Sequence, residues 1–192
     1  FDPVSHILDI AMADNTVVRD KRYGLSTVTG EHLALRFCKL MLAKKHGTLC
    51  VVLCPTKQVA SLYYHAARRW HPGMHTKMIL GTPDVDSYTR SQWREVAEAA
   101  ECMITTPQIF LDTLRHRHLS ACLFCAVVFV ECRLCAKTSR SLQHSHPFTE
   151  IPGYFLGGDR GSRLLGIQGM SSLIFDAAQV KDRLQARILE VV

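Results

Sequence analysis

The sequence has no long hydrophobic run. No apolar stretch in its 192 residues approaches the roughly 18 residues that a membrane-spanning helix needs. The N-terminal stretch FDPVSHILDIAMADN also lacks the basic start and the small-residue cleavage site of a secretory signal. We therefore expect a soluble, unsecreted protein in the cytoplasm, with the nucleus as an alternative. Because the chain begins with Phe1 rather than Met, we also expect an excised or processed piece of a larger protein.

Internal repeats and low-complexity tracts are absent too. With 47% hydrophobic and 21% charged residues, the chain can bury a sizeable core, and its length fits a single domain over residues 1–192. The net charge is +6 and the isoelectric point is about 9.0. The basic residues gather in the segments KRY, AKKHG, HAARRWH and LRHRH. This excess of positive charge favours an anionic partner such as nucleic acid.

The eight cysteines raise the alternatives of disulfides and of a metal site. Without a secretory signal, reduced thiols are the expectation. Two Cys-x-x-Cys pairs in CLFCAVVFVECRLC and two histidines further on invite a zinc assignment: Cys122, Cys125, Cys132, Cys135, His144 and His146. The apolar spacer AVVFVE is shorter than the roughly 12 to 20 residues between zinc-ligand pairs, and an extended strand holds the pairs about 20 Å apart. We predict no metal site, and zinc remains the minor alternative.

Strand-like and helix-like patterns alternate along the chain. The strand-like segments are residues 15–18, 48–54, 76–80, 102–106, 123–131 and 162–168; the helix-like segments are 31–45, 57–70, 91–100 and 107–117, and a patterned stretch over 176–192 closes the chain. Such alternation predicts an α/β fold with a mainly parallel sheet covered on both faces. The continuous apolar runs CVVLC and CAVVFVE predict its centre. Ligands of open parallel sheets lie beyond the carboxyl ends of the strands.

Six segments, in order, resemble the successive motifs of a superfamily 2 RNA helicase. They are LSTVTGEHLAL, VVLCPTKQVASL, MITTPQIFLDTLRH, VVFVECRLC, HPFTEI and RLLGIQGMSSL. The chain resembles in particular the first RecA-like domain of the Dicer helicase region, in the RIG-I-like branch, over nearly its whole length. This resemblance implies a three-layer RecA-like domain of the P-loop NTPase type, with residues 1–192 forming a single first helicase lobe.

The first motif departs from the family pattern. In the family it ends in Gly-Lys-Thr, whose amides and lysine hold the β- and γ-phosphates while the hydroxyl binds Mg²⁺. Here these places hold Gly30, Glu31 and His32, and Val28 replaces a glycine of the turn. A carboxylate at the lysine place repels a triphosphate. We therefore expect a phosphate loop that no longer binds phosphate.

The second and third motifs depart as well. The resemblance assigns the Mg²⁺-binding Asp of the second motif to Val130, and only the water-positioning Glu remains, as Glu131. The third motif, Thr-Ala-Ser in the family, reads Gln-Gly-Met over residues 168–170, and Val4 aligns with the glutamine that reads adenine. We therefore predict no catalytic residue, with Glu131 as a remnant, and no cofactor, since ATP and Mg²⁺ binding are expected to be lost.

The RNA-facing motifs are better preserved. Pro55 and Thr56 match motif Ia, and Thr106, Pro107 and Gln108 match motif Ib. In relatives these loops contact the phosphate backbone through hydroxyls, amides and helix N-termini. The alternative is that Thr-Pro merely starts a helix.

The resemblance implies a catalytically degenerate helicase lobe of a Dicer-like endoribonuclease of RNA silencing. The lobe itself is expected to cut nothing, because the acidic clusters of a ribonuclease III centre are absent from this sequence. Expected partners are double-stranded RNA, a second helicase lobe and ribonuclease III domains of the parent chain, and a double-stranded RNA-binding protein, with no membrane. Two alternatives remain: an active ATP-dependent translocase lobe, and a protein-interaction module without RNA binding.

Overall fold

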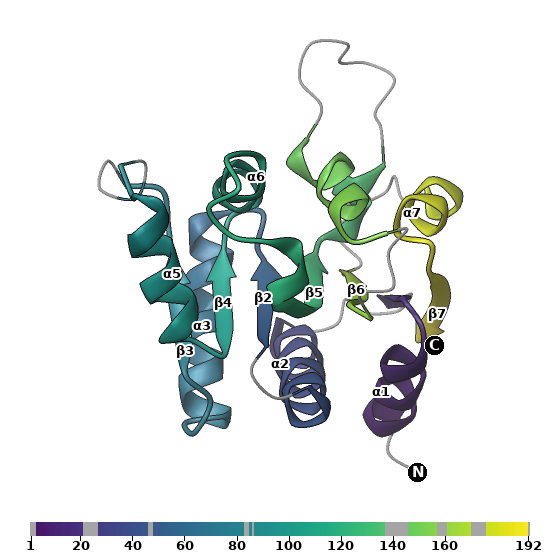
Figure 1. The fold of residues 1–192 in the computed structure, drawn as a ribbon. Coiled ribbons are helices and arrows are strands. Elements are labelled where there is room, and N and C mark those ends of the chain that lie inside the picture. The colour runs from purple at the N-terminus through teal and green to yellow at the C-terminus, as the bar shows by residue number, and fades with distance from the viewer. Residues whose placement is uncertain are drawn as a thin grey trace.

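The computed structural model of the chain describes residues 3–20, 27–45, 48–82, 85, 87–136, 146–156, 161–169 and 176–191. These residues form one seven-stranded sheet with helices on both faces, as Figure 1 shows. Every strand pairing is parallel. The α/β fold with a parallel sheet is therefore confirmed. None of the described helices is long and apolar enough to cross a bilayer.

The sheet has the strand order β3-β4-β2-β5-β6-β1-β7. Its strands are β1 (Thr16–Asp20), β2 (Leu49–Leu53), β3 (Thr76–Ile79), β4 (Cys102–Thr105), β5 (Phe124–Val130), β6 (Arg163–Gln168) and β7 (Arg187–Val191). All residues of β2 and β5 are buried, and both strands have neighbours on either side. The central position predicted for the two continuous apolar runs is confirmed, because such strands are covered on both faces.

The helices divide between the two faces of the sheet. They are α1 (Pro3–Ala13), α2 (Thr27–Lys44), α3 (Lys57–Trp70), α5 (Arg90–Glu98), α6 (Pro107–Arg115) and α7 (Ala177–Leu184). One hydrophobic core contains the buried residues of α1, α2 and α3, and a second contains those of α5, α6 and α7. Figure 1 shows α1 and α2 on the side of the sheet opposite α6 and α7. The helix-like segments are confirmed, whereas α1 was not predicted.

Short 3-10 turns precede and follow β5 and complete the second face. They are η1 (Ala121–Leu123), η2 (Cys132–Cys135), η3 (Pro147–Thr149) and η4 (Ile151–Tyr154). Close packing holds η2 against the sheet: a Cβ added at Gly166 of β6 would lie 3.0 Å from Sγ of Cys132 and 3.0 Å from Cγ2 of Val17. Only glycine therefore fits at this crossing without displacing its neighbours.

The closing stretch, 176–192 in the sequence, forms two elements. Helix α7 ends at Leu184, and Gln185 takes a left-handed conformation with φ 47°. This turn redirects the chain into β7, which pairs with β1 at the edge of the sheet. A helical pattern alone does not reveal the break, because a left-handed residue is usually glycine or asparagine rather than glutamine.

Candidate functional site at the carboxyl edge of the sheet

The site residues predicted from the sequence lie near one edge of the sheet. Because all strands are parallel, their carboxyl ends lie along the same edge, and the helices that follow them begin there. The second- and third-motif residues lie at the last positions of β5 and β6 or directly after them, and the RNA-motif residues follow β2 and β4. The first-motif residues Gly30, Glu31 and His32 belong to α2, which follows β1.

The first-motif residues lie inside a helix rather than in a turn that precedes it. Helix α2 already begins at Thr27, three residues before Gly30. The Glu31 side chain is 7% exposed, and burial raises the pKa of its carboxyl. His32 packs edge-on against the Trp70 ring of α3, with ring centroids 5.6 Å apart. Neither side chain resembles the lysine and hydroxyl that hold a nucleotide phosphate and its metal.

Two carboxylates lie near one buried phenol at this edge. Desolvation raises the pKa of Tyr63 of α3, and the charges of Cys54, Glu31 and Glu131 raise it further. Desolvation also raises the pKa of Cys54, and the charge of Glu31 adds to this increase. The Glu31 carboxylate opposes the approach of a polyphosphate, whereas the Glu131 carboxylate faces the Arg133 guanidinium at 3.4 Å.

Glu131 is held in a hydrogen-bond network. Its backbone is left-handed, with φ 58° and ψ 55°. Its Oε2 accepts a hydrogen bond of 2.9 Å from Nε2 of Gln168 and lies 3.4 Å from Nε of Arg133. Gln168 is 1% exposed, and its Oε1 accepts the backbone N–H of Arg133 at 2.9 Å while its Nε2 also donates to the carbonyl of Gly169 at 2.9 Å. This network fixes the one carboxylate retained from the second motif against the strand that carries the third.

Apolar side chains occupy two other places assigned to nucleotide contacts. Val130 is 6% exposed and belongs to the same core as α1 and α2. Val4 of α1 is partly buried against that core. A valine offers neither a metal ligand nor a hydrogen bond to a base. Met170 lies outside the described residues.

The two RNA motifs are neighbours. Strands β2 and β4 pair with Leu53 opposite Thr105, and the N–H of Cys54 donates to the Thr105 carbonyl at 2.9 Å. Motif Ia therefore starts beside motif Ib. Thr56 caps α3, since its hydroxyl accepts the N–H of Val59 at 3.2 Å. Thr106 precedes α6 in an extended conformation, but its hydroxyl makes no capping bond.

The other two residues of motif Ib have local roles in α6. Pro107 is buried at the first position of the helix, where its missing N–H costs no hydrogen bond. Gln108 is exposed, and its Nε2 lies 2.9 Å from both carboxylate oxygens of Asp112 one turn later. The alternative that Thr-Pro starts a helix is thus correct for Pro107. The Thr106 hydroxyl, however, does not cap this helix.

The cysteine pairs flank β5 at its two ends. Cys122 and Cys125 lie at the start of the strand, and Cys132 and Cys135 lie in η2 after its end. Burial raises the pKa of Cys132 and of Cys135, which disfavours the thiolate that a metal would need. All eight cysteines are free thiols. Within the described residues, which exclude His144, no group of three or more His, Cys, Asp or Glu side chains has a metal-binding arrangement.

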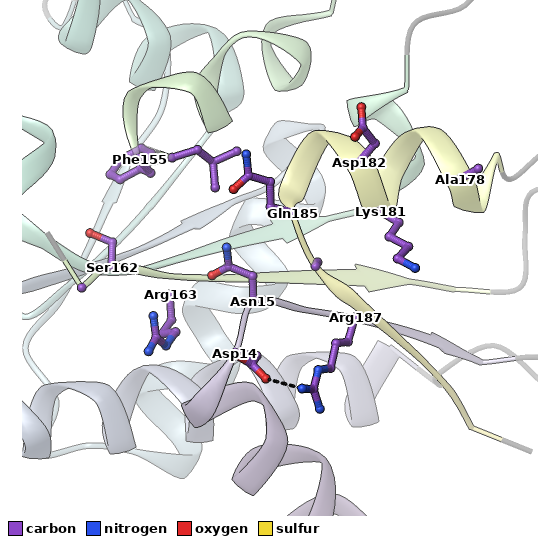
Figure 2. A pocket seen from close by; sticks show the side chains of 13 residues that line it. Asp14, Asn15, Phe155, Ser162, Arg163, Ala178, Lys181, Asp182, Gln185 and Arg187 are labelled. Carbon is purple, nitrogen blue, oxygen red and sulfur yellow. Dashed lines mark ion pairs between the residues drawn. The ribbon is translucent and has the colours of Figure 1, made fainter. Parts of the chain in front are cut away.

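A pocket of about 750 Å³ at the opposite edge is lined in part by polar side chains that bond to other parts of the protein. Figure 2 shows it between the end of α1, the amino end of β6 and the turn from α7 to β7. Nδ2 of Asn15 donates to the Leu184 carbonyl at 3.1 Å, and its Oδ1 accepts the N–H of Leu164 at 3.0 Å. Arg187 forms an ion pair of 3.1 Å with Asp14, which Figure 2 also shows. These bonds connect the elements around the pocket, so we assign the pocket a structural role.

Sequence reasoning missed the partners of two site residues. It identified Glu131 and Gln168 one by one, but their hydrogen bond joins two motifs that are 37 positions apart. The signal available in the sequence was the replacement of a short hydroxyl residue by glutamine, whose longer side chain can reach a neighbouring strand. Asn15, which joins three elements, carried no recognisable signal.

The relatives found by comparison with known proteins include Dicer-like proteins and Dicer homologues. The chain is 26% identical to Dicer-like protein 2 of Cryphonectria parasitica over 133 residues, 68% of this chain, and 31% identical to Endoribonuclease Dicer homolog 2 of Arabidopsis thaliana over 130 residues, 65% of this chain. It is 26% identical to Endoribonuclease Dicer homolog 3b of Oryza sativa subsp. japonica over 165 residues, 80% of this chain. Each match spans 9% of the length of that relative. No family model matches the chain.

A solved structure has the same fold. The helicase domain of Hef from Pyrococcus furiosus superposes on the chain with a TM-score of 0.73, covering 97% of this chain and 37% of that one. The sequence identity is 14%, so this likeness concerns the fold alone. The relatives confirm the resemblance to Dicer-like proteins, and the solved structure confirms the RecA-like fold class.

Proposed function

We propose that this chain, a homologue of the Dicer-like proteins with the fold of a helicase RecA-like domain, is a helicase lobe that contacts double-stranded RNA without hydrolysing ATP. It would act as a scaffold within a Dicer-like endoribonuclease of RNA silencing. Its partners would be a second helicase lobe and the ribonuclease III domains of the parent. The proposed RNA contact lies near the carboxyl edge of the sheet, where the residues predicted for nucleotide and RNA binding also lie.

The observation that carries this proposal is the buried carboxylate of Glu31. In the helicase resemblance its place belongs to a lysine that neutralises the β- and γ-phosphates. A unit charge pair at 4 Å is worth about 1 kcal/mol in water and about 4 kcal/mol near a protein surface, so reversing the sign is costly in both settings. The residues present do not fit a Mg²⁺-nucleotide, because Val130 is an apolar core residue where a metal-binding carboxylate would stand.

The network around Glu131 supports the same proposal. A carboxylate that positions an attacking water must be available to it, whereas Oε2 of Glu131 accepts a hydrogen bond from Gln168 and faces Arg133. We assign Glu131 a structural role, in which it joins the end of β5 to the end of β6. The carboxylate that remains from the second motif therefore stabilises the structure rather than positioning a water molecule.

RNA contact is assigned to the paired loops of motifs Ia and Ib. The Thr106 hydroxyl makes no capping bond, so it is available to a phosphate oxygen, and the N-termini of α3 and α6 begin beside each other. Contacts of this kind carry no base information. The expected binding is therefore independent of RNA sequence and falls steeply as salt rises.

The nucleotide part is tested by ATPase and thermal-shift measurements on the parent protein, with and without double-stranded RNA. We expect no RNA-stimulated ATP hydrolysis by this lobe and no stabilisation by millimolar Mg²⁺-ATP beyond that of Mg²⁺ alone. Glu31→Lys alone should not restore turnover, because the metal ligand is still missing. Turnover that disappears in Glu131→Gln would instead identify an active translocase.

The RNA part is tested by Thr106→Glu in the same parent. A negative charge at the proposed phosphate contact should weaken double-stranded RNA binding about tenfold, the effect of roughly 1.4 kcal/mol. Ser120→Glu is the matched control, because it adds the same charge at an exposed position on the opposite edge of the sheet. Equal RNA affinity of the wild type and Thr106→Glu would favour the protein-interaction alternative.

A further inference from the structure

A second cavity of about 890 Å³ runs along α5 and reaches the amino edge of the sheet. It lies between α5, the end of α6 and the segments that lead into β2 and β5. Its apolar lining consists of Leu42, Leu49, Ala97, Ala100, Leu114, Leu119, Ala121 and Leu123. Leu123 is 38% exposed. We call this cavity the α5 groove.

Positive charge surrounds the α5 groove. Arg90, Arg94 and Arg117 line it, and all three are exposed. Among the described residues, none of these three guanidinium groups has an ion-pair partner. Of the two carboxylates in the lining, that of Glu101 already accepts the N–H of His75 at 2.8 Å. The groove therefore offers unpaired cations beside an apolar surface.

Two of these cations lie together against local electrostatics. Arg90 and Arg94 are one turn apart on α5, an i,i+4 spacing at which like charges repel. Arg90 is also the first residue of the helix, where the dipole disfavours a positive charge. Helix α5 forms nevertheless, because Thr89 and Gln92 make a reciprocal capping box. Arg94 is also followed one turn later by Glu98, an i,i+4 spacing at which opposite charges attract, so the electrostatically unfavourable position is that of Arg90.

Arg117 occupies a position that suits glycine. It follows α6 with φ 55°, in the left-handed region. Its N–H donates to the Leu114 carbonyl at 3.1 Å, and the N–H of His118 donates to the Thr113 carbonyl at 3.0 Å. These two bonds define a Schellman motif, in which glycine is the usual residue. An arginine there strains the backbone and places a cation at the rim of the groove.

We propose that the α5 groove binds an extended, acidic segment of a partner protein, whose apolar side chains enter the groove and whose carboxylates pair with Arg90, Arg94 and Arg117. The groove runs along α5, whose nine residues span about 13 Å, the length of about four extended residues. An apolar surface flanked by cations matches a peptide that alternates apolar and acidic side chains.

Single-stranded RNA fits this groove less well. Its backbone has the charge but no apolar groups for the leucine-rich lining, and its bases would need aromatic platforms. Among the described residues that line the groove, Tyr154 carries the one aromatic ring apart from the imidazole of His118. The proposal is therefore independent of the RNA contact at the carboxyl edge and concerns a different class of ligand.

The test uses fluorescein-labelled peptides of eight residues, with leucine at alternate positions and glutamate, serine or lysine between them. Fluorescence anisotropy with the 192-residue chain should show the glutamate peptide binding at least tenfold more tightly than the serine peptide. The lysine peptide should not bind. Arg94→Gln and Arg117→Gly should each weaken the glutamate peptide about threefold, and the double variant about tenfold.

Two controls separate binding from folding. Arg117→Gly should keep or raise the unfolding temperature, because glycine adopts the left-handed conformation readily, so weaker binding in this variant cannot arise from unfolding. Arg69→Gln removes an exposed arginine of α3 outside the groove and should leave the affinity unchanged.

Three results would overturn the proposal. The first is the absence of binding by the glutamate peptide, and the second is equal affinity for the serine peptide or for the double variant. The third is displacement of the peptide by an eight-nucleotide oligouridylate whose own binding depends on Arg94 and Arg117, which would assign the groove to RNA.

Discussion

Glu31 lies where its charged form is poorly solvated. Burial raises the folded-state pKa of its carboxyl above the unfolded value of 4.5. The folded state then binds more protons than the unfolded state between these two pKa values, so stability falls as pH rises through that window. The cost of the charge is complete above the folded pKa and vanishes below the unfolded one.

We therefore predict that Glu31→Gln stabilises the chain at pH 7.5. The gain is measured as a rise in the unfolding temperature, at about 2–4 °C for each kcal/mol in a chain of this length. The gain should shrink as pH is lowered and disappear below about pH 4. Thermal unfolding across this pH range measures it, with the exposed Glu95→Gln as the control that should show no such gain. A loss of stability at pH 7.5 would contradict the burial cost.

At the scale of elements, Asn15 joins three parts of the fold at the pocket of Figure 2. Its side chain binds the last residue of α7 and an N–H of β6, and its own carbonyl accepts the N–H of Arg187 that starts β7. Both side-chain bonds are partly buried, so removing the amide leaves a carbonyl and an N–H without partners. An unsatisfied buried group costs about 1–3 kcal/mol.

Asn15→Ala is predicted to lower the free energy of unfolding by about 2–3 kcal/mol, since two such groups lose their partner. Hydrogen exchange at the amide of Leu164 should accelerate more than exchange at the centre of β5. Gln108→Ala, which removes an exposed amide bonded within one helix, is the control and should cost about 0.5 kcal/mol or less. Unchanged exchange at Leu164 would mean that Asn15 does not hold β6.

The elements differ in how far the sequence reveals them. The apolar runs of β2 and β5 and the amphipathic pattern of α3 depend on periodicity, which the sequence displays directly, and these elements were predicted correctly. The joint at Asn15 and the bond from Gln168 to Glu131 depend on which strands become neighbours, and local pattern does not encode this. The turn at Gln185 was missed because a non-glycine residue adopts a left-handed conformation only when tertiary contacts impose it.

At the scale of the whole molecule, the fold separates one cysteine from the other seven. Cys122 is exposed, whereas the remaining cysteines are at most 1% exposed. A hydrogen bond with Cys38 raises the pKa of Cys102, and burial raises that of Cys132. Hydrogen bonds with neighbouring thiols lower the pKa of Cys38 and of Cys125, but neither side chain is accessible to a reagent in the folded chain.

Titration of the native chain with a thiol reagent is predicted to modify one cysteine rapidly. The other seven should react only when the chain unfolds, at rates that report the opening of the core. Cys122→Ser should remove the rapid phase and leave the slow phases unchanged. A second rapid thiol in the native chain would show that part of the core opens far more often than its burial implies.

Strand β1 lies between β6 and β7, so the first strand of the chain is enclosed by the last two. The strands that pair with β1 lie far from it in the sequence. Closing such a long loop costs conformational entropy, and this cost must be met before the sheet can be completed. During synthesis, α1 and β1 leave the ribosome with neither neighbouring strand yet made. The part of the sheet formed by β2, β3 and β4 can assemble meanwhile, and this sheet is complete only after residues 187–191 have emerged.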